Sequence, residues 1–164
     1  ALRVGVSLAK ALAVARSLPL VAIGTLEIEV HPYLGLGLPV CAVIEAGRSM
    51  VYTATFGPDS RDSSGPPEHT VKTHADLVSG LDQKTLFCGE AVGPLRGFLR
   101  VNLGEEAVLA ECEPPTRQPG VLARLGYRRL VASDTDDPET LEPLYMRGSQ
   151  FDKARHRAGA ARGR

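Results

Sequence analysis

The sequence predicts an α/β protein with a mixed sheet. β-Rich runs alternate with helical runs along most of the chain, which is the pattern of α/β folds. Two β-rich runs, 40–46 and 50–56, also flank the tripeptide Gly47-Arg48-Ser49, which predicts a hairpin with a glycine-containing turn. A hairpin pairs its strands antiparallel, whereas strand–helix–strand crossovers pair them parallel, so both kinds of pairing are expected in one sheet.

The first element is a helix over residues 2–17, which Leu18-Pro19 ends. Its few polar residues lie on a narrow stripe, so we expect the helix to be buried on most sides. Gly5, Ala9 and Ala13 lie four residues apart and let another helix approach closely. The protein's own core explains one apolar face, and a second apolar face suggests a partner. The chain has no initiator Met and no capping residue before this helix, so we expect it to begin inside a longer chain.

The remaining elements follow from local patterns. Residues 57–68 form a polar surface loop and residues 133–142 an acidic linker. In the helix over 120–132, the inner side is expected to carry Leu122, Leu125, Leu130 and Val131. The other expected elements are strands at 20–24, 69–73 (an edge strand), 85–88 and 107–112, and helices at 25–31, 75–81 and 94–100.

Composition excludes several classes of function. The 164 residues carry 19 basic and 19 acidic side chains, so a nucleic-acid binder that works through its overall field is excluded. The three cysteines lie far apart, each in an apolar run, which favours buried thiols over disulfides or a zinc site. Charged residues interrupt the most apolar stretch, so we expect no membrane span and a cytoplasmic protein.

The sequence offers no catalytic, cofactor-binding or metal-binding motif. His31, His69, His74 and His156 do not have the spacing of metal ligands. The turn 89–91 after a buried strand could cradle a phosphate, although a plain exit from the strand is the commoner reading. Glu45 ends an apolar strand without a second carboxylate or a histidine at readable spacing. We therefore predict no catalytic residue and no cofactor.

Three stretches together resemble the TsaB (YeaZ) family. Residues 2–27 resemble the stretch that follows the family's GPGSFTG loop, residues 43–56 resemble its hairpin, and 143–147 resemble its terminal P-x-Y-x-R. Glu45 stands where the family usually has Asp, and Met50 where Glu is common. The matching residues are Leu2, Arg3, Gly5, Ala9, Lys10, Leu12, Ala13, Pro19, Thr25 and Leu26 in the first stretch, and Ile44, Ala46, Val51 and Tyr52 in the second.

The resemblance implies an actin/Hsp70-like fold of two related lobes, with the first lobe incomplete in this chain. Residues 1–39 would be the remnant of the N-terminal lobe, consisting of the interface helix and a strand. Residues 40–147 would form the C-terminal lobe, and 148–164 a basic flexible tail.

The resemblance also implies a function in making N6-threonylcarbamoyladenosine in tRNA. TsaB-like proteins are non-catalytic partners of a TsaD-like protein, self-associate, and join a TsaE-like ATPase through the complex. Contact with tRNA would be indirect, and no cofactor is implied. The family's pairing surface includes the helix that matches residues 2–17. We therefore expect a partner-binding surface at Arg3, Val6, Ala9, Lys10 and Ala13.

Two other classes of function remain open from the sequence. The first is an enzyme of the same fold, either a nucleotide hydrolase or a glycoprotease-like peptidase, which would turn over substrate without partners. The second is an RNA-binding module that uses the basic tail, which would bind tRNA in a salt-sensitive way and lose that binding when residues 148–164 are deleted.

Overall fold

The computed structural model describes residues 2–47, 49–58, 69–111 and 115–144. The chain divides into two compact units. Unit 1 combines Ala1–Ala22 with Gly126–Arg164, and unit 2 is Ile23–Leu125. The expected tail over 148–164 and the end of the 143–147 motif lie outside the described residues.

Unit 2 is built on a five-stranded sheet in the order β3-β2-β1-β4-β5. The hairpin β1–β2 and the pair β2–β3 are antiparallel, whereas β1–β4 and β4–β5 are parallel. The mixed sheet, the hairpin and the edge strand predicted from the sequence are thus confirmed. The strands are β1 (Val40–Gly47), β2 (Met50–Phe56), β3 (Thr70–Thr73), β4 (Thr85–Cys88) and β5 (Ala107–Leu109).

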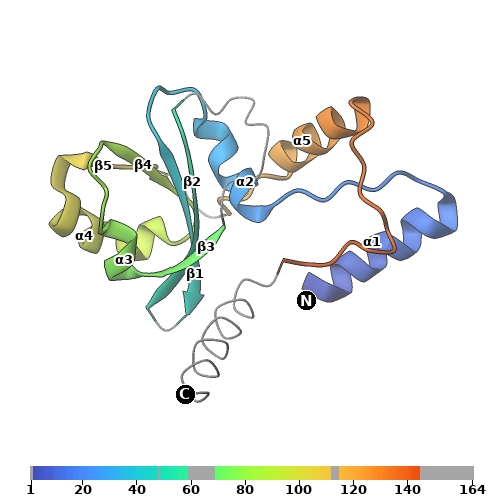
Figure 1. Ribbon diagram of the computed structural model, residues 1–164, viewed down its shortest axis with the longest axis horizontal. Coiled ribbons are helices and arrows are strands. Elements are labelled where there is room, and N and C mark those ends of the chain that lie inside the picture. Colours follow the sequence, from blue (N-terminus) through green and yellow to red (C-terminus); the bar gives the residue numbers. More distant parts are fainter. Residues whose placement is uncertain (1, 48, 59–68, 112–114, 145–164) are drawn as a thin grey trace, which may run out of the picture. The chain divides into compact units, whose positions relative to one another are not determined.

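Helices cover both faces of this sheet (Figure 1). On one face, α3 (His74–Val78) and α4 (Val92–Leu103) contribute to the main core. This core unites strand residues such as Val43 and Phe87 with Leu95 and Leu99 of α4, all of them buried. The other face is covered by α2 (Thr25–Val30), which packs against β1 and is followed by the 3₁₀ turn η1 (His31–Tyr33). A second turn, η3 (Gly104–Glu106), links α4 to β5.

A smaller apolar cluster joins α2 to the start of α5 (Pro119–Val131). Ile28 of α2 packs with Val121 and Leu125 of α5, and Ile23 covers the cluster. The inner side of α5 therefore differs from the expected one, because of the four residues predicted to face inward only Leu125 is buried. Val121 is buried in place of Leu122, because it lies one turn before Leu125 and on the same face of the helix.

Unit 1 contains α1 (Leu2–Arg16), the segment that follows it, the last turns of α5, and the segment 133–144. The strand predicted over 20–24 does not form. Within 20–24 the one β-bridge joins Leu20 to Asp136. Two residues later the pairing ends, because the N–H of Ala22 donates to the side chain of Asp136 and not to the backbone of a second strand. The helix prediction for α1 is confirmed, but its expected burial is wrong, since Ala13 is its one buried residue among those described.

The lobe boundaries expected from the sequence stay a prediction beside this division into two units. Residues 23–39 group with the sheet rather than with α1, because α2 packs against β1. No helix among the described residues is long and apolar enough to cross a membrane.

Candidate functional site

The residues predicted to bind a partner lie on different sides of α1. Arg3 and Ala9 are exposed, Val6 and Lys10 are half-buried, and Ala13 is only 5% exposed. Positions 6, 10 and 13 follow one another at intervals of four and three residues, so they share one side of the helix. That side is the one that unit 1 itself partly covers.

The contacts of Lys10 show which segment covers this side of α1. Its ammonium donates a hydrogen bond of 2.8 Å to the carbonyl of Leu141 and a longer one of 3.4 Å to that of Glu139. The segment after α5 is thereby tied to the middle of α1. Lys10 serves the structure of unit 1 in this arrangement, and the free surface of α1 lies elsewhere.

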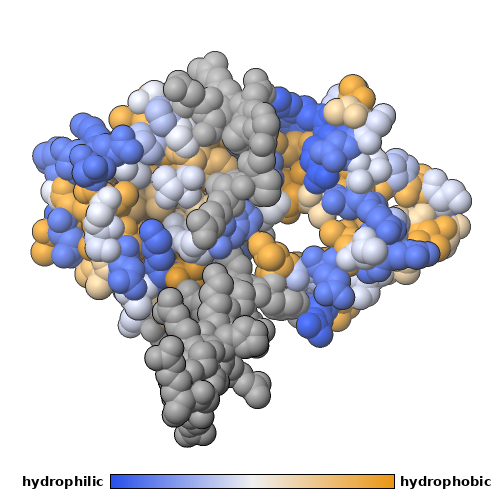
Figure 2. Space-filling view, viewed as in Figure 1, coloured by the Kyte–Doolittle hydropathy of each residue, from blue (hydrophilic) through white to orange (hydrophobic). Residues whose placement is uncertain are grey.

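The opposite side of α1 carries an exposed apolar face. Val4, Leu8 and Leu12 follow one another at intervals of four residues and are 72%, 60% and 54% exposed. Leu2 and Val14 are also exposed, at 60% and 65%, but each lies about 120° around the helix from Leu8 and outside this face. Hydrophobic side chains are visible at the molecular surface along this helix in Figure 2. We call Val4, Leu8 and Leu12 the α1 apolar face. The sequence predicts a second apolar face for a partner on this helix, but the partner residues expected from the sequence do not include Val4, Leu8 or Leu12.

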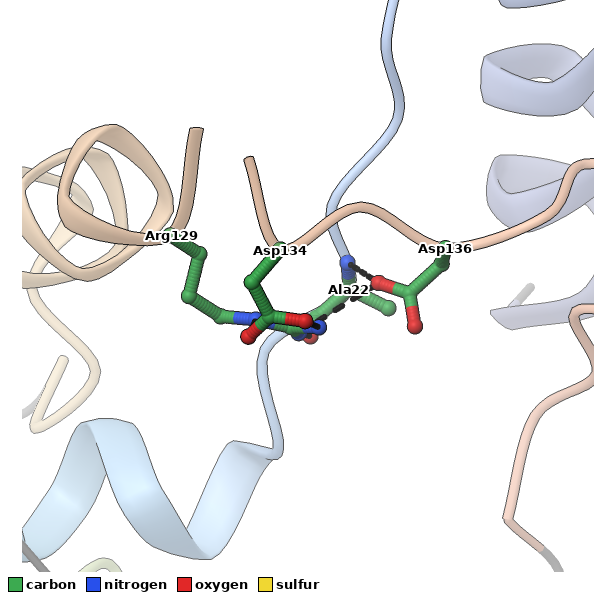
Figure 3. Close-up of polar contacts among 4 residues, drawn as sticks. All are labelled: Ala22, Arg129, Asp134 and Asp136. Atoms are coloured by element: carbon green, nitrogen blue, oxygen red, sulfur yellow. Dashed lines mark hydrogen bonds and ion pairs between the residues drawn. The ribbon is translucent and has the colours of Figure 1, made fainter. Parts of the chain in front are cut away.

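A polar clamp fixes the chain that leads away from α1 (Figure 3). The Arg129 guanidinium donates to the carbonyl of Ala22 at 2.7 Å, and the Asp136 carboxylate accepts from the N–H of Ala22 at 2.7 Å. Arg129 and Asp136 also form an ion pair at 3.3 Å. Together the two side chains satisfy both backbone groups of one residue, as a neighbouring strand would. We call Ala22, Arg129 and Asp136 the Ala22 clamp.

Asp134 holds Arg129 in position for the clamp. Its carboxylate accepts two hydrogen bonds from the guanidinium, at 2.6 and 3.0 Å. These bonds raise the pKa of Arg129 and lower the pKa of Asp134 below its ordinary value of 3.8. The contribution of this pair to stability is therefore complete above pH 3.8 and is lost as the pH falls through the lower, folded-state pKa of Asp134.

Unit 2 holds a second polar cluster around a buried carboxylate. Glu29 of α2 is 2% exposed and accepts a hydrogen bond of 2.7 Å from the hydroxyl of Thr116. The Arg117 Nε lies 3.9 Å from the same carboxylate oxygen, and the other side of the guanidinium pairs with Glu90. Burial raises the pKa of Glu29 above its ordinary value of 4.5, while Thr116 and Arg117 oppose the rise. Glu29 falls in a helix predicted from the sequence, but the sequence around it carries no signal of its burial.

The turn 89–91 does not have the form of an open phosphate cradle. The N–H of Ala91 bonds to the carbonyl of Val43 at 3.2 Å, and that of Val92 to the carbonyl of Gly89 at 3.1 Å. The Glu90 side chain adds a negative charge beside them. Gly89 has φ +105°, and a Cβ there would lie 2.5 Å from the Val43 carbonyl oxygen. The glycine thus allows β4 to leave the sheet close to β1, which is a structural role.

The described residues provide little for chemistry. Among them no group of three or more His, Cys, Asp or Glu side chains could hold a metal ion. Glu45 is an exposed residue of β1, opposite Val51 of β2. The structure does not bring Glu45 into the cluster of Glu29 and Glu90. The α1 apolar face is therefore the feature that most directly suggests a function.

Comparisons with known proteins agree with the resemblance found in the sequence. A family model described as "TsaD: tRNA N6-adenosine threonylcarbamoyltransferase" matches residues 1–79. A YeaZ structure from Pseudomonas aeruginosa matches with a TM-score of 0.66 and 17% identity over 87% of this chain. A second structure, an uncharacterized protein with similarity to peptidase YEAZ from the same organism, matches with a TM-score of 0.62 and 17% identity over 88% of this chain.

The chain spans 66% of the length of each of these two structures. No curated protein matches the sequence. The α/β fold with a mixed sheet is the fold of YeaZ, consistent with the actin/Hsp70-like class expected from the sequence.

The first prediction concerns the Ala22 clamp. Asp136→Ala removes the acceptor for the Ala22 N–H and one partner of Arg129, so we expect unit 1 to lose about 1 kcal/mol of stability. Urea unfolding followed by circular dichroism, with hydrogen exchange of residues 18–22, measures the loss. Glu142→Gln, an exposed change in the same segment, is the control. Equal stability of the two variants would contradict the clamp.

The second prediction concerns the turn after β4. Gly89→Ala places a Cβ against the Val43 carbonyl at a positive φ, so we expect a loss of about 2–4 kcal/mol in the free energy of unfolding. Gly93→Ala in α4 is the matched control, because nothing lies within 4 Å of its added Cβ and alanine favours the helix. Thermal unfolding of both variants tests this, and a Gly89→Ala protein as stable as Gly93→Ala would refute it.

Proposed function

The chain is YeaZ (TsaB)-like, and on that premise we propose that it is a non-catalytic partner of a TsaD-like protein in the synthesis of N6-threonylcarbamoyladenosine in tRNA. It acts by forming a heterodimer. Docking favours the active arrangement of the TsaD-like protein to the extent that the chain binds that arrangement more tightly than the inactive one. We assign no catalytic step to this chain.

The observation that carries this proposal is the α1 apolar face. Val4, Leu8 and Leu12 are more than half exposed, so the described chain leaves most of their apolar surface in water. Full burial of one such side chain against a partner contributes about 1.5–3 kcal/mol. Three of them in one line on a helix are typical of the anchors that a partner helix or groove accepts.

The fixed position of α1 supports the same proposal. On the other side of the helix, Lys10 is bonded to the carbonyl of Leu141 in unit 1, and Ala13 is buried. The Ala22 clamp holds the segment that follows α1. A helix anchored on one side and exposed on the other loses little conformational freedom on binding, so less of the gain from burial is offset.

Further partners follow from the same role. We propose that a TsaE-like ATPase joins through the complex, and that two copies of this chain associate through α1 when no TsaD-like protein is present. Contact with tRNA is indirect in this proposal. The protein is expected in the cytoplasm, where its complex would modify tRNA. The predicted partner residues Arg3 and Ala9, which are exposed, would border the docked surface.

The third prediction tests the α1 apolar face. Leu8→Glu places a charge in the middle of that face, so we expect co-purification with the cognate TsaD-like protein to fall at least tenfold. Leu12→Glu should act in the same way. The isolated chain should keep its circular dichroism spectrum, because both side chains are exposed in the structure.

Val101→Glu in α4 is the matched control, since Val101 is an apolar helix residue that is 85% exposed but lies in unit 2. It should co-purify like the unaltered chain. A Leu8→Glu protein that still co-purifies would overturn the assignment of this surface. Nucleotide or peptide turnover by the isolated chain would favour an enzyme of this fold instead.

A further inference from the structure

A polar cluster around the buried Glu29 in unit 2 is not used by the proposed partner role. Glu29 lies on α2, Thr116 and Arg117 lie just before α5, and Glu90 lies in the turn between β4 and α4. One guanidinium thus joins carboxylates from two other parts of the unit. The three parts are separate in sequence, and Arg117 pairs with a carboxylate from each of the other two.

The cluster adjoins the apolar contact between α2 and α5. Ile28, next to Glu29, packs with Val121 and Leu125 of α5. Arg117 and Thr116 lie immediately before α5, which begins at Pro119. Opening the polar contacts would therefore release the entry to α5 from the same short helix that holds its apolar side.

We propose that Glu29, Thr116, Arg117 and Glu90 form a proton-sensitive clasp that sets how firmly the start of α5 is held against α2. Glu29 is the sensor because its carboxyl is buried when the clasp is closed and hydrated when it is open. Arg117 is the compensating charge, which lets an ionised Glu29 remain buried. The clasp is independent of the α1 apolar face.

The charges that act on Glu29 come from each part that meets at the cluster. Arg117 of the segment before α5 favours the ionised form, and Glu90 of the β4–α4 turn disfavours it. Thr116 donates a hydrogen bond, and the adjoining contacts of α5 are apolar. α2 also packs against β1 and β2, whose described charges are not among the groups that shift Glu29.

The direction of the pH response follows from burial. The pKa of Glu29 is raised in the closed clasp above its ordinary value of 4.5, so the closed form binds the proton more tightly than the open form. The clasp is therefore firmest below pH 4.5. It loosens as the pH rises from 4.5 to the raised value and is constant above that value.

The experiment measures the carboxyl pKa of Glu29 by carbon NMR and the hydrogen-exchange protection of the Val121 and Leu122 amides across this range. Both amides bond to the carbonyl of Gln118 in the first turn of α5, so their protection reports its opening. In the unaltered chain, protection should fall as Glu29 ionises. In Glu29→Gln, which keeps an acceptor for Thr116, the protection should not change with pH.

Arg117→Gln should raise the pKa of Glu29 further, and at neutral pH protection of the two amides should fall about tenfold for each unit of that rise. At acidic pH, where Glu29 is neutral, the loss should be much smaller. Arg96→Gln is the matched control, because Arg96 forms an exposed pair of 3.7 Å with Glu111 in the same connection from β5 to α5. The proposal is overturned if Arg117→Gln behaves like Arg96→Gln, or if Glu29→Gln keeps the pH response.

Discussion

The arrangement of unit 1 depends on two side chains that complete the backbone of Ala22. The segment after α1 does not pair as a strand beyond Leu20, so the N–H and carbonyl of Ala22 need other partners. Asp136 supplies the acceptor and Arg129 the donor, each at 2.7 Å. Since the two residues flank the end of α5, this pairing joins the segment after α1 to the segment after α5. Hydrogen bonds to charged groups make that join stronger than neutral ones would.

Unit 1 holds α1 by polar contacts, which leave the apolar side of this helix exposed. In unit 2 the helices bury their apolar residues against the sheet, and Leu95 and Leu99 of α4 are examples. In unit 1 the corresponding role falls to Lys10 and the Ala22 clamp, and most leucines and valines of α1 stay exposed. An apolar helix that its own unit holds by polar contacts is suited to bury its apolar side against another protein. The proposed partner role rests on this division.

The sheet was predictable from the sequence, whereas the burial of Glu29 and the exposure of α1 were not. The β-rich runs 40–46 and 50–56 and the turn between them were local signals, so the hairpin and the mixed sheet were predictable. The burial of Glu29 was not, because its partners Thr116 and Arg117 lie far along the chain. The apolar composition of α1 predicted burial, but composition cannot tell a core from an interface. The strand expected at 20–24 does not form, because side chains of the Ala22 clamp bond the backbone of Ala22 where a neighbouring strand would be needed.

The central claim is that this chain pairs with a TsaD-like protein through α1. The most direct measurement is the mass, by light scattering, of the species purified after co-expression with the cognate TsaD-like protein. The account predicts one stable heteromer that separates into two species when Leu8 is replaced by Glu. Two separate species with the unaltered chain would contradict it, and a heteromer that survives the Leu8 replacement would contradict the role of the α1 apolar face.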